Sequence, residues 1–444
     1  MVKWILLSAL TLLGIAITPY DHLRSQDDQS PRFGRVAYLG TPDIEYSSFT
    51  LSPDGRILVA NASRLLPVDA GTGEERRCCI GRDVQQVWYL SDEGNWQAAI
   101  FNPPNATYQW VGEPDKQYEQ VDALETALSF SPDGRYLAVR TFEEIQIRSA
   151  PKFGVVIEQY YATPTDSIYV RGDAQVAWST DSRFLAYLER QVLRVLEIAT
   201  GESVSTIVQT PNPVLIATEF GWIVYWSDGS QDDIPAEFTA CLLNLMECAR
   251  YQTTARGLAL FEFASQSSEV LVLDTLEGRN SESIAEFSRW ISLGGVHFEE
   301  EALTVTFPDL TDYCIPMQFN SNETRLLFKC VGEQLVDDPL ETLHIFNYPS
   351  MTQPRILTID DPIWTAGWLM GDDHIYVYDD YHDVVRLHDT TEDREIDDVN
   401  LNQLHPHVGE HDDVLPAIPL FLETEGLLVM QQASHLVAIE ILYP

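Results

Sequence analysis

Residues 130–139 read Phe-Ser-Pro-Asp-Gly-Arg-Tyr-Leu-Ala-Val, and altered copies of this stretch recur along most of the 444-residue chain. Within it, Pro132 sets the backbone for a turn and Asp133 can accept hydrogen bonds from the backbone that follows it. Gly134 permits the left-handed conformation that reverses the chain. Because apolar residues lie on both sides of the turn, the stretch predicts a β-hairpin. Its copies predict a chain built from many such hairpins.

The copies set the repeat length and the fold class. Nine windows carry the pattern, beginning at Leu51, Leu90, Phe130, Trp178, Phe220, Phe263, Phe319, Trp368 and Phe421. The clearest ones lie about 40 to 50 residues apart, which leaves room for four short strands each. Runs such as 57–60, 136–139 and 223–226 are continuously apolar, as in sheets that are covered on both faces. This pattern predicts an all-β fold, a β-propeller of four-stranded antiparallel blades. We expect eight blades, with seven and nine as alternatives.

Residues 34–444 are predicted to form this single propeller domain. Three late strands, at 416–420, 427–431 and 435–442, lack a fourth strand, which 35–39 can supply. Strands from both ends of the chain should therefore close the domain. The first repeat is expected to take its third and fourth strands from a second hairpin between Leu65 and Cys78.

Helical patterns are scarce. Residues 281–291 form the one segment that we interpret as helical, and we place it in a loop between strands.

The pattern Phe-Ser-Pro-Asp-Gly-Arg-x-Leu-Ala is matched fully at 130–138 and closely at 51–59. It resembles the WD40-like repeat of TolB-type propellers, which also occurs in propellers attached to prolyl-oligopeptidase-like peptidases. The resemblance is good over 45–190 and weak elsewhere, and it implies a fold more than a function. Members bind proteins, gate peptidase domains or form periplasmic scaffolds. The chain has no Gly-x-Ser-x-Gly nucleophile motif, and its later strands lack the Trp-Asp pair of the strict WD40 repeat.

The chain is strongly acidic. It holds 27 Lys and Arg against 68 Asp and Glu, a formal net charge of −41. Such a surface repels the phosphates of nucleic acids and anionic lipids, so neither is expected as a partner. The charge is interpreted as a solvated acidic surface, or alternatively as a surface for cations or a basic partner.

Residues 1–20 have the features of a targeting segment. Lys3 precedes the apolar run 4–18, which has the length of a signal-peptide core and is short for a spanning helix. We interpret the segment as a signal peptide or an N-terminal membrane anchor, followed by a polar linker at 21–33. The protein is expected to be exported: periplasmic, extracellular or anchored on the outer face of a membrane. Contact with the membrane is expected only through residues 1–20, if they are retained.

The six cysteines are expected to form disulfides, because export places them in an oxidising compartment. Cys314 and Cys330 are equidistant from Asn322, so a hairpin that turns there sets them opposite each other across two strands.

The other cysteines are less constrained by spacing. Cys241 and Cys248 flank six residues and can close a short loop. The adjacent Cys78 and Cys79 must bond each other or reach other partners. Structural bridges are the favoured interpretation for all six cysteines, with a redox role for the adjacent pair as the alternative.

Histidine is concentrated in residues 374–411. Six of the ten histidines lie there among many aspartates: His374, His382, His388, His405, His407 and His411. Imidazole and carboxylate together suit zinc, copper or manganese, and on an extended segment His405 and His407 point to the same side. A transition-metal site with His405, His407 and His411 as ligands is therefore weighed against a polar loop between blades. The sequence predicts no other cofactor.

The aspartates of the repeat turns, Asp54, Asp133 and Asp181, occupy equivalent positions in different repeats. Turn formation explains them without catalysis, and no residue is singled out as catalytic.

The sequence thus predicts an exported, monomeric, non-catalytic propeller scaffold that binds a protein or other macromolecule through blade loops. The alternative is a propeller enzyme, a hydrolase or lyase, with a metal site near 374–411.

Overall fold

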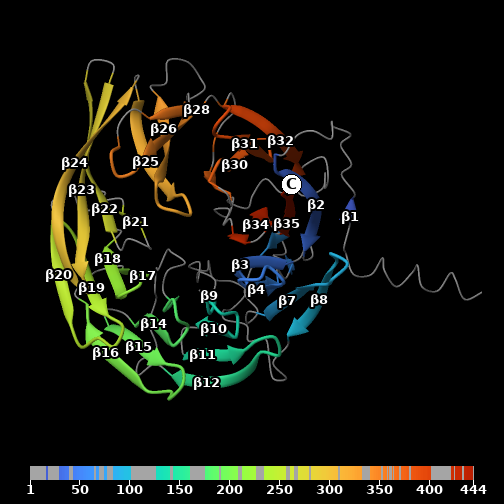
Figure 1. The fold of residues 1–444 in the computed structure, drawn as a ribbon. Coiled ribbons are helices and arrows are strands. Elements are labelled where there is room, and N and C mark those ends of the chain that lie inside the picture. The colour runs from blue at the N-terminus through green and yellow to red at the C-terminus, as the bar shows by residue number, and fades with distance from the viewer. Residues whose placement is uncertain are drawn as a thin grey trace, which may run out of the picture. The chain divides into compact units, whose positions relative to one another are not determined.

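The computed structural model gives an all-β chain made of antiparallel sheets (Figure 1). It describes residues 17–18, 30–39, 44–64, 67–69, 75–77, 84–101, 127–140, 144–160, 176–189, 192–208, 213–226, 235–256, 261–264, 269–279, 282–308, 311–332, 341–351, 354–357, 359, 363, 365–369, 372–379, 382–401, 422–424, 426–432 and 435–443. The chain divides into two compact units, one of residues 1–176 with 402–444 and one of residues 177–401.

The first unit contains three larger sheets and a small hairpin. One sheet has the order β1-β2-β35-β34-β33, with β1 Ile17–Thr18, β2 Arg32–Leu39, β33 Leu422–Thr424, β34 Leu427–Gln432 and β35 His435–Leu442. The second has the order β3-β4-β7-β8, with β3 Ile44–Leu51, β4 Ile57–Arg64, β7 Val84–Leu90 and β8 Trp96–Phe101. The third holds β9 Ala127–Phe130, β10 Tyr136–Arg140, β11 Glu144–Ser149 and β12 Gly154–Tyr160. The hairpin pairs β5 Pro67–Asp69 with β6 Glu75–Arg77.

The second unit contains five sheets, each of four strands in sequence order; Val176, the first residue of β13, belongs to the first unit. The first two sheets hold β13 Val176–Trp178, β14 Phe184–Glu189, β15 Val192–Glu197 and β16 Ser203–Ile207, then β17 Pro213–Ala217, β18 Gly221–Trp226, β19 Pro235–Leu242 and β20 Cys248–Arg256. The third holds β21 Phe261–Ala264, β22 Glu269–Arg279, β23 Glu282–Gly294 and β24 His297–Pro308. The last two hold β25 Thr311–Phe319, β26 Arg325–Gly332, β27 Glu341–Asn347 and β28 Arg355–Leu357, then β29 Thr365–Trp368, β30 His374–Asp379, β31 Val384–Asp389 and β32 Arg394–Asn400.

A strand from the start of the chain completes a sheet of late strands. β2 pairs antiparallel with β35, and the register sets Val36 opposite Ile439 and Leu39 opposite Leu436. Val36 and Leu39 are 1% exposed, and Leu436 and Ile439 are fully buried. Both strands therefore belong to the core of the first unit.

The repeat windows coincide with turns, with one difference from expectation. Eight of the nine windows lie between the first and second strands of a four-stranded sheet. For the window at Phe421 these strands are β33 and β34, and β2 counts as the fourth strand of that sheet. The window at Leu90 instead joins β7 to β8, the third and fourth strands of their sheet. The hairpin expected between Leu65 and Cys78 exists as β5 and β6, but it lies outside that four-stranded sheet. The expectation for the strands of the first repeat was therefore wrong, because turn residues do not say which strands the turn joins.

The helix predicted at 281–291 is also wrong. Residues 282–291 of this segment lie in β23, which pairs with β22 on one side and with β24 on the other. Its register runs from Glu282 opposite Pro308 to Gly294 opposite His297. Backbone pairing along both edges of the strand outweighs the weak helical spacing of its apolar residues.

Apolar cores lie between successive sheets within each unit. In the first unit, Leu58, Trp88, Val429 and Ala438 join one buried cluster from two sheets. In the second, clusters of the same kind join β14 and β15 to β18 and β19, β24 to the sheet of β25, and that sheet to β29 and β30. The apolar strands therefore have both faces covered, as their continuous apolar runs predicted.

Within the described ranges, no helix is long and apolar enough to cross a membrane.

Candidate functional site

The repeat turns use their aspartates for backbone hydrogen bonds. Ser131 Oγ donates to Asp133 Oδ1 at 2.8 Å, and Tyr136 N donates to Ser131 Oγ at 3.0 Å. Asp54 and Asp181 accept the same hydroxyl and backbone bonds in their own turns. Turn formation thus accounts for all three carboxylates.

The electrostatics of Asp133 agree with a structural role. Burial acts to raise the pKa of this carboxyl, but bonds from Arg135 N and the Ser131 hydroxyl outweigh it and hold the pKa below 3.8. A carboxylate that stays ionised is a poor general acid at neutral pH.

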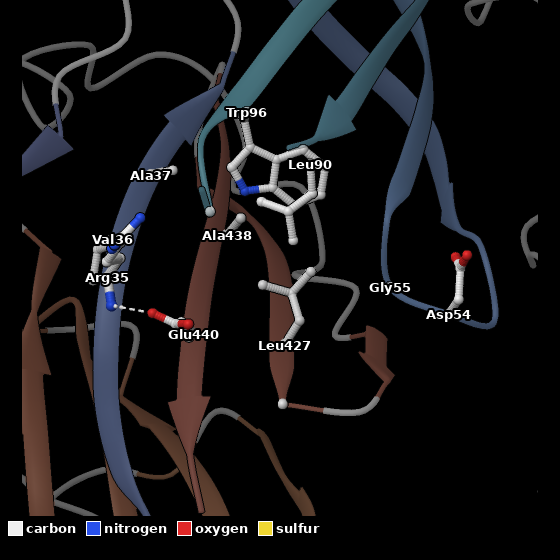
Figure 2. Close-up of a pocket in the computed structure, with 12 residues that line it drawn as sticks. Arg35, Val36, Ala37, Asp54, Gly55, Leu90, Trp96, Leu427, Ala438 and Glu440 are labelled. Atoms are coloured by element: carbon white, nitrogen blue, oxygen red, sulfur yellow. Dashed lines mark hydrogen bonds between the residues drawn. The ribbon is translucent and has the colours of Figure 1, made fainter. Parts of the chain in front are cut away.

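A cavity of about 140 Å³ lies in the first unit, against β2, β34, β35 and the turns that follow β3 and β7 (Figure 2). Ala37, Trp96 and Leu427 give it apolar walls. Its polar groups are already engaged, because Arg35 N donates to Glu440 Oε2 at 3.1 Å and the Arg35 guanidinium donates to Glu93 O at 2.7 Å. Ligand pockets usually enclose roughly 300–1,000 Å³, so this cavity is a weak candidate for a substrate site.

The structure describes residues 374–379 and 382–401 of the histidine-rich segment. Asp379 is fully buried at the end of β30, and its Oδ2 lies 2.6 Å from His382 Nδ1 and 3.4 Å from Arg386 Nη1. In the same sheet, His388 Nε2 lies 3.1 Å from Asp393 Oδ1. The segment therefore forms pairs between imidazole and carboxylate.

The predicted metal ligands His405, His407 and His411 lie outside the described residues. Among the residues that are described, no three or more His, Cys, Asp or Glu side chains are grouped to hold a metal ion.

A charged network that sequence reasoning missed connects two sheets of the second unit. Arg289 on β23 donates to Glu269 from Nε at 3.0 Å and from Nη2 at 2.8 Å. The same Nε lies 2.8 Å from Tyr348 Oη, and the Tyr348 hydroxyl donates to Glu269. The three residues are up to 79 positions apart, so no local motif predicts their meeting.

Arg289 and Tyr348 of this network stay protonated at neutral pH. Burial raises the pKa of Tyr348, and the bond to Glu269 raises it further, well above 10. Burial lowers the pKa of Arg289, but Glu269 and Tyr348 outweigh this effect and raise it. Groups that keep their protons at neutral pH favour a structural link between the sheets over proton transfer.

Two cysteine pairs lie at disulfide distance. Cys314 and Cys330 face each other across β25 and β26 with Cα atoms 4.1 Å apart, as the hairpin symmetry predicted. Cys241 and Cys248 are opposite each other on β19 and β20, also with Cα atoms 4.1 Å apart. Cys78 and Cys79 lie outside the described residues.

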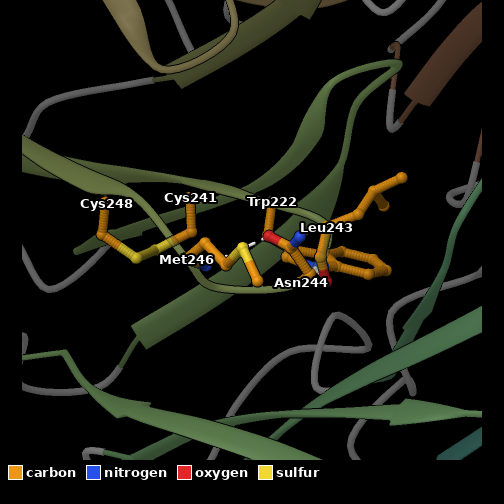
Figure 3. Close-up of a disulfide and its surroundings, with 6 residues drawn as sticks. All are labelled: Trp222, Cys241, Leu243, Asn244, Met246 and Cys248. Carbon is orange, nitrogen blue, oxygen red and sulfur yellow. Dashed lines mark hydrogen bonds between the residues drawn. A yellow bond between two sulfur atoms is a disulfide. The ribbon is translucent and has the colours of Figure 1, made fainter.

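The turn between β19 and β20 carries Met246 beside the pair of Cys241 and Cys248 (Figure 3). Cys241 and Cys248 close it, and Trp222 Nε1 donates to Leu243 O at 3.2 Å. At its tip Asn244 Oδ1 accepts a bond from Met246 N at 3.1 Å, and the Met246 side chain is 85% exposed. No sequence signal separated this methionine from a core residue.

A second apolar turn joins β23 to β24. Leu293 is 66% exposed there, and the glycines at 294 and 295 both take positive φ. His297 Nε2, just beyond the turn, lies 3.3 Å from Glu247 Oε1. The two exposed apolar turns are therefore in contact within the second unit.

No family model matches the sequence, and no curated protein matches it. Among solved structures, the WD40 domain of SCAP from fission yeast is similar at 10% identity, covering 92% of this chain and 98% of that one, with a TM-score of 0.50. The fold is a β-propeller. It is all-β with four-stranded antiparallel blades, as predicted.

A second solved structure is dihydro-heme d1 dehydrogenase NirN in complex with DHE. It shares 10% identity, with coverage of 90% of this chain and 74% of that one, and the TM-score is 0.46.

Proposed function

We propose that this protein is an exported, monomeric, non-catalytic propeller scaffold that binds a partner protein through its turns. The observation that carries the proposal is the exposed Met246 at the tip of a braced hairpin. Burial of one large apolar side chain contributes about 1.5–3 kcal/mol, and a few such anchors dominate most protein interfaces. A methionine held in solvent is well suited to this use.

The more specific parts of the proposal rest on sequence. The TolB type of WD40-like repeat is supported by 130–138, and export by residues 1–20. The cysteine pairs at disulfide distance agree with an oxidising compartment. The non-catalytic role is supported by the turn aspartates, whose bonds serve the backbone.

Affinity capture tests the proposal. The mature chain and its Met246→Ser variant would each be immobilised and exposed to the native extract. We expect the wild type to retain one partner protein. After purification, that partner should bind the wild-type chain in calorimetry. If the wild type retains nothing beyond what an unrelated acidic protein retains, the proposal is wrong.

A catalytic alternative is favoured by one specific observation, the pair of Asp379 and His382. A fully buried carboxylate 2.6 Å from Nδ1 orients an imidazole that is about half exposed, which is the arrangement of a general base with its orienting acid. A panel of hydrolase and lyase substrates would test it. Turnover that His382→Ala abolishes, while His374→Ala preserves it, would support this alternative; no turnover would end it.

The metal site at His405, His407 and His411 remains a proposal attached to this alternative. Metal analysis of the purified protein would contradict it by finding less than about a tenth of an equivalent of zinc, copper or manganese.

A further inference from the structure

We propose that Met246 is a site of reversible oxidation by hydrogen peroxide, and that its conversion to methionine sulfoxide releases the partner protein. This inference rests on the proposed function, in which Met246 anchors the partner, and adds to it a chemical regulation of that contact. The observations that carry it are the exposure of Met246, the burial of other methionines and a turn whose hydrogen bonds do not use the Met246 side chain.

The fold makes the methionines unequally accessible to a small oxidant. Met246 is 85% exposed at the tip of the turn between β19 and β20, whereas Met351 is 2% exposed and Met430 is fully buried. Met317 on β25 is partly buried against a core cluster of the second unit. Oxidation of a thioether follows its exposure. Among these four methionines, peroxide should therefore react first with Met246.

Residues 241–248, all of which the structure describes, offer peroxide one reactive sulfur. Cys241 and Cys248 lie at disulfide distance at the base of the turn, with Met246 beside them (Figure 3). Free thiolates are oxidised readily, but cysteines that are bonded to each other have no thiolate. The thioether of Met246 is thus the sulfur of this turn that reacts with peroxide.

The turn keeps its conformation without the Met246 side chain. Its backbone is closed by bonds from Leu242 N to Glu247 O at 3.0 Å and from Leu245 N to Leu242 O at 2.9 Å. Met246 contributes its backbone N, which donates to Asn244 Oδ1 at 3.1 Å. Oxidation would therefore change a surface group and leave the fold intact.

The modification replaces an apolar group by a strongly polar one. The oxygen of methionine sulfoxide accepts hydrogen bonds, so burying it against an apolar partner surface costs free energy unless a donor is present. The free energy that the apolar Met246 side chain contributes by burial is lost at the same time. Oxidation should therefore weaken partner binding by about tenfold or more.

The reaction needs hydrogen peroxide as its co-reactant. The Met246 sulfur attacks one peroxide oxygen, an S–O bond forms and the O–O bond breaks. The departing hydroxide takes the proton from the transferred oxygen and leaves as water, so sulfur loses two electrons and peroxide gains them. A dithiol reductant acting through a methionine sulfoxide reductase reverses the change, with the oxygen leaving as water and the dithiol becoming a disulfide.

Peptide mass spectrometry of the full chain during exposure to hydrogen peroxide tests the site. We expect sulfoxide to form at Met246 at least about tenfold faster than at Met351 or Met430, with Met317 between them. The matched control is the same chain unfolded in guanidinium chloride, where the four methionines should oxidise at similar rates because no fold protects them. Equal rates at Met246 and Met430 in the folded chain would overturn the assignment of the site.

A partition experiment tests the release. A partly oxidised sample of the chain would be passed over the immobilised partner protein retained from the native extract, and its bound and unbound fractions would be compared. We expect Met246 sulfoxide to be depleted at least about fivefold in the bound fraction. Met317 sulfoxide is the internal control and should be evenly distributed. Treatment of the unbound chain with methionine sulfoxide reductase and a dithiol should restore its binding.

The Met246→Gln variant supplies a polar side chain of similar length without peroxide. It should bind the partner about tenfold more weakly than the wild type. Its melting temperature should change by less than about 2 °C, because the bonds of the turn use the backbone. A large loss of stability would mean that the side chain supports the turn, and would overturn the inference.

The outcomes separate this inference from the proposed function. An even distribution of Met246 sulfoxide between bound and unbound chain would overturn the release and leave the proposed function standing. If the wild type captures no protein from the native extract, the proposed function itself falls, and the regulation falls with it.

Discussion

Ser131 shows how one side chain fixes a repeat turn. It is fully buried, donates to Asp133 and accepts from Tyr136 N. In the turn between β25 and β26 the same need is met differently, because Asn320 Oδ1 accepts bonds from Thr324 N at 2.9 Å and Arg325 N at 2.8 Å. The requirement at this position is a buried acceptor for the returning backbone, which explains why later copies lose the sequence pattern and keep the turn.

We predict that Ser131→Ala lowers the free energy of unfolding by about 1–2 kcal/mol, since it leaves the Tyr136 amide without its acceptor and removes a bond to Asp133. The pKa of Asp133 should rise as well. Urea unfolding and an NMR titration of the carboxyl measure both effects. Ser205→Ala, on the exposed strand β16, serves as the control and should change stability by less than about 0.5 kcal/mol. An unchanged Ser131→Ala protein would contradict this account of the turn.

Titration of Tyr348 makes the free energy of unfolding depend on pH in the alkaline range. Its pKa is raised above 10 in the folded protein, first by burial and then by Glu269. The unfolded chain therefore loses this proton at lower pH than the folded chain, so the contribution is fully present below pH 10 and is lost as the pH rises above it.

The measurement is urea unfolding at a series of pH values from neutral upward. We expect the wild type to lose stability above pH 10 more steeply than Tyr348→Phe, which lacks the titrating group. Equal slopes for the two proteins would contradict the assignment.

At the scale of elements, close approach of backbones limits what the strands tolerate. β18 begins at Gly221, where a Cβ atom would lie 2.0 Å from the carbonyl oxygen of Cys241 on β19. Gly201 offers a contrast, because its φ is +71° but no atom lies within 4 Å of a Cβ placed there.

Gly221→Ala is predicted to destabilise the protein by about 3 kcal/mol, since the strand pair must separate to admit a methyl group. Gly201→Ala should cost only about 1 kcal/mol, the cost of the left-handed conformation. Thermal unfolding of the two variants provides the comparison. Equal losses would mean that strand spacing adapts freely at Gly221.

The two cysteine pairs should differ in what they contribute. The loop that links Cys314 to Cys330 spans 16 positions and that between Cys241 and Cys248 spans 7. Because loop-closure entropy grows with loop length, replacing both cysteines by serine should cost about 3 kcal/mol for the longer loop and about 2.5 kcal/mol for the shorter one. Denaturant unfolding of both double variants checks the order. No loss in either would indicate that the bridges do not form.

Sequence patterns predicted the hairpins, the antiparallel sheets and both cysteine pairs, because turn residues and apolar runs act locally. They failed where the outcome depends on distant residues. The turn after Leu90 has the same residues as other repeat turns but joins a different pair of strands. The network of Glu269, Arg289 and Tyr348 is assembled from two sheets, and the exposure of Met246 depends on how its hairpin is placed. Local sequence patterns do not predict contacts between residues that are far apart in the chain.

At the scale of the whole molecule, the net negative charge affects stability. With −41 spread over 444 residues, repulsion between surface carboxylates opposes compaction. Salt screens this repulsion, so the melting temperature should rise between about 20 mM and about 500 mM sodium chloride. Each kcal/mol regained corresponds to roughly 2–4 °C for a domain of 150–250 residues and to less for a longer chain. Scanning calorimetry measures the shift, with a neutral sugar at matched osmolality as the control. A melting temperature independent of salt would contradict this expectation.

The pairing of β2 with β35 sets an order for biosynthesis. The second unit is a continuous segment, 177–401, whereas the first unit needs residues from both ends of the chain. During translation the second unit can complete its sheets before β35 is made, so β2 still lacks the partner that supplies Leu436 and Ile439. The sheet that contains β2 is thus among the last to be completed. Until β33, β34 and β35 are made, this sheet is incomplete and its apolar faces are exposed. A chaperone that shields such faces would therefore act on the first unit.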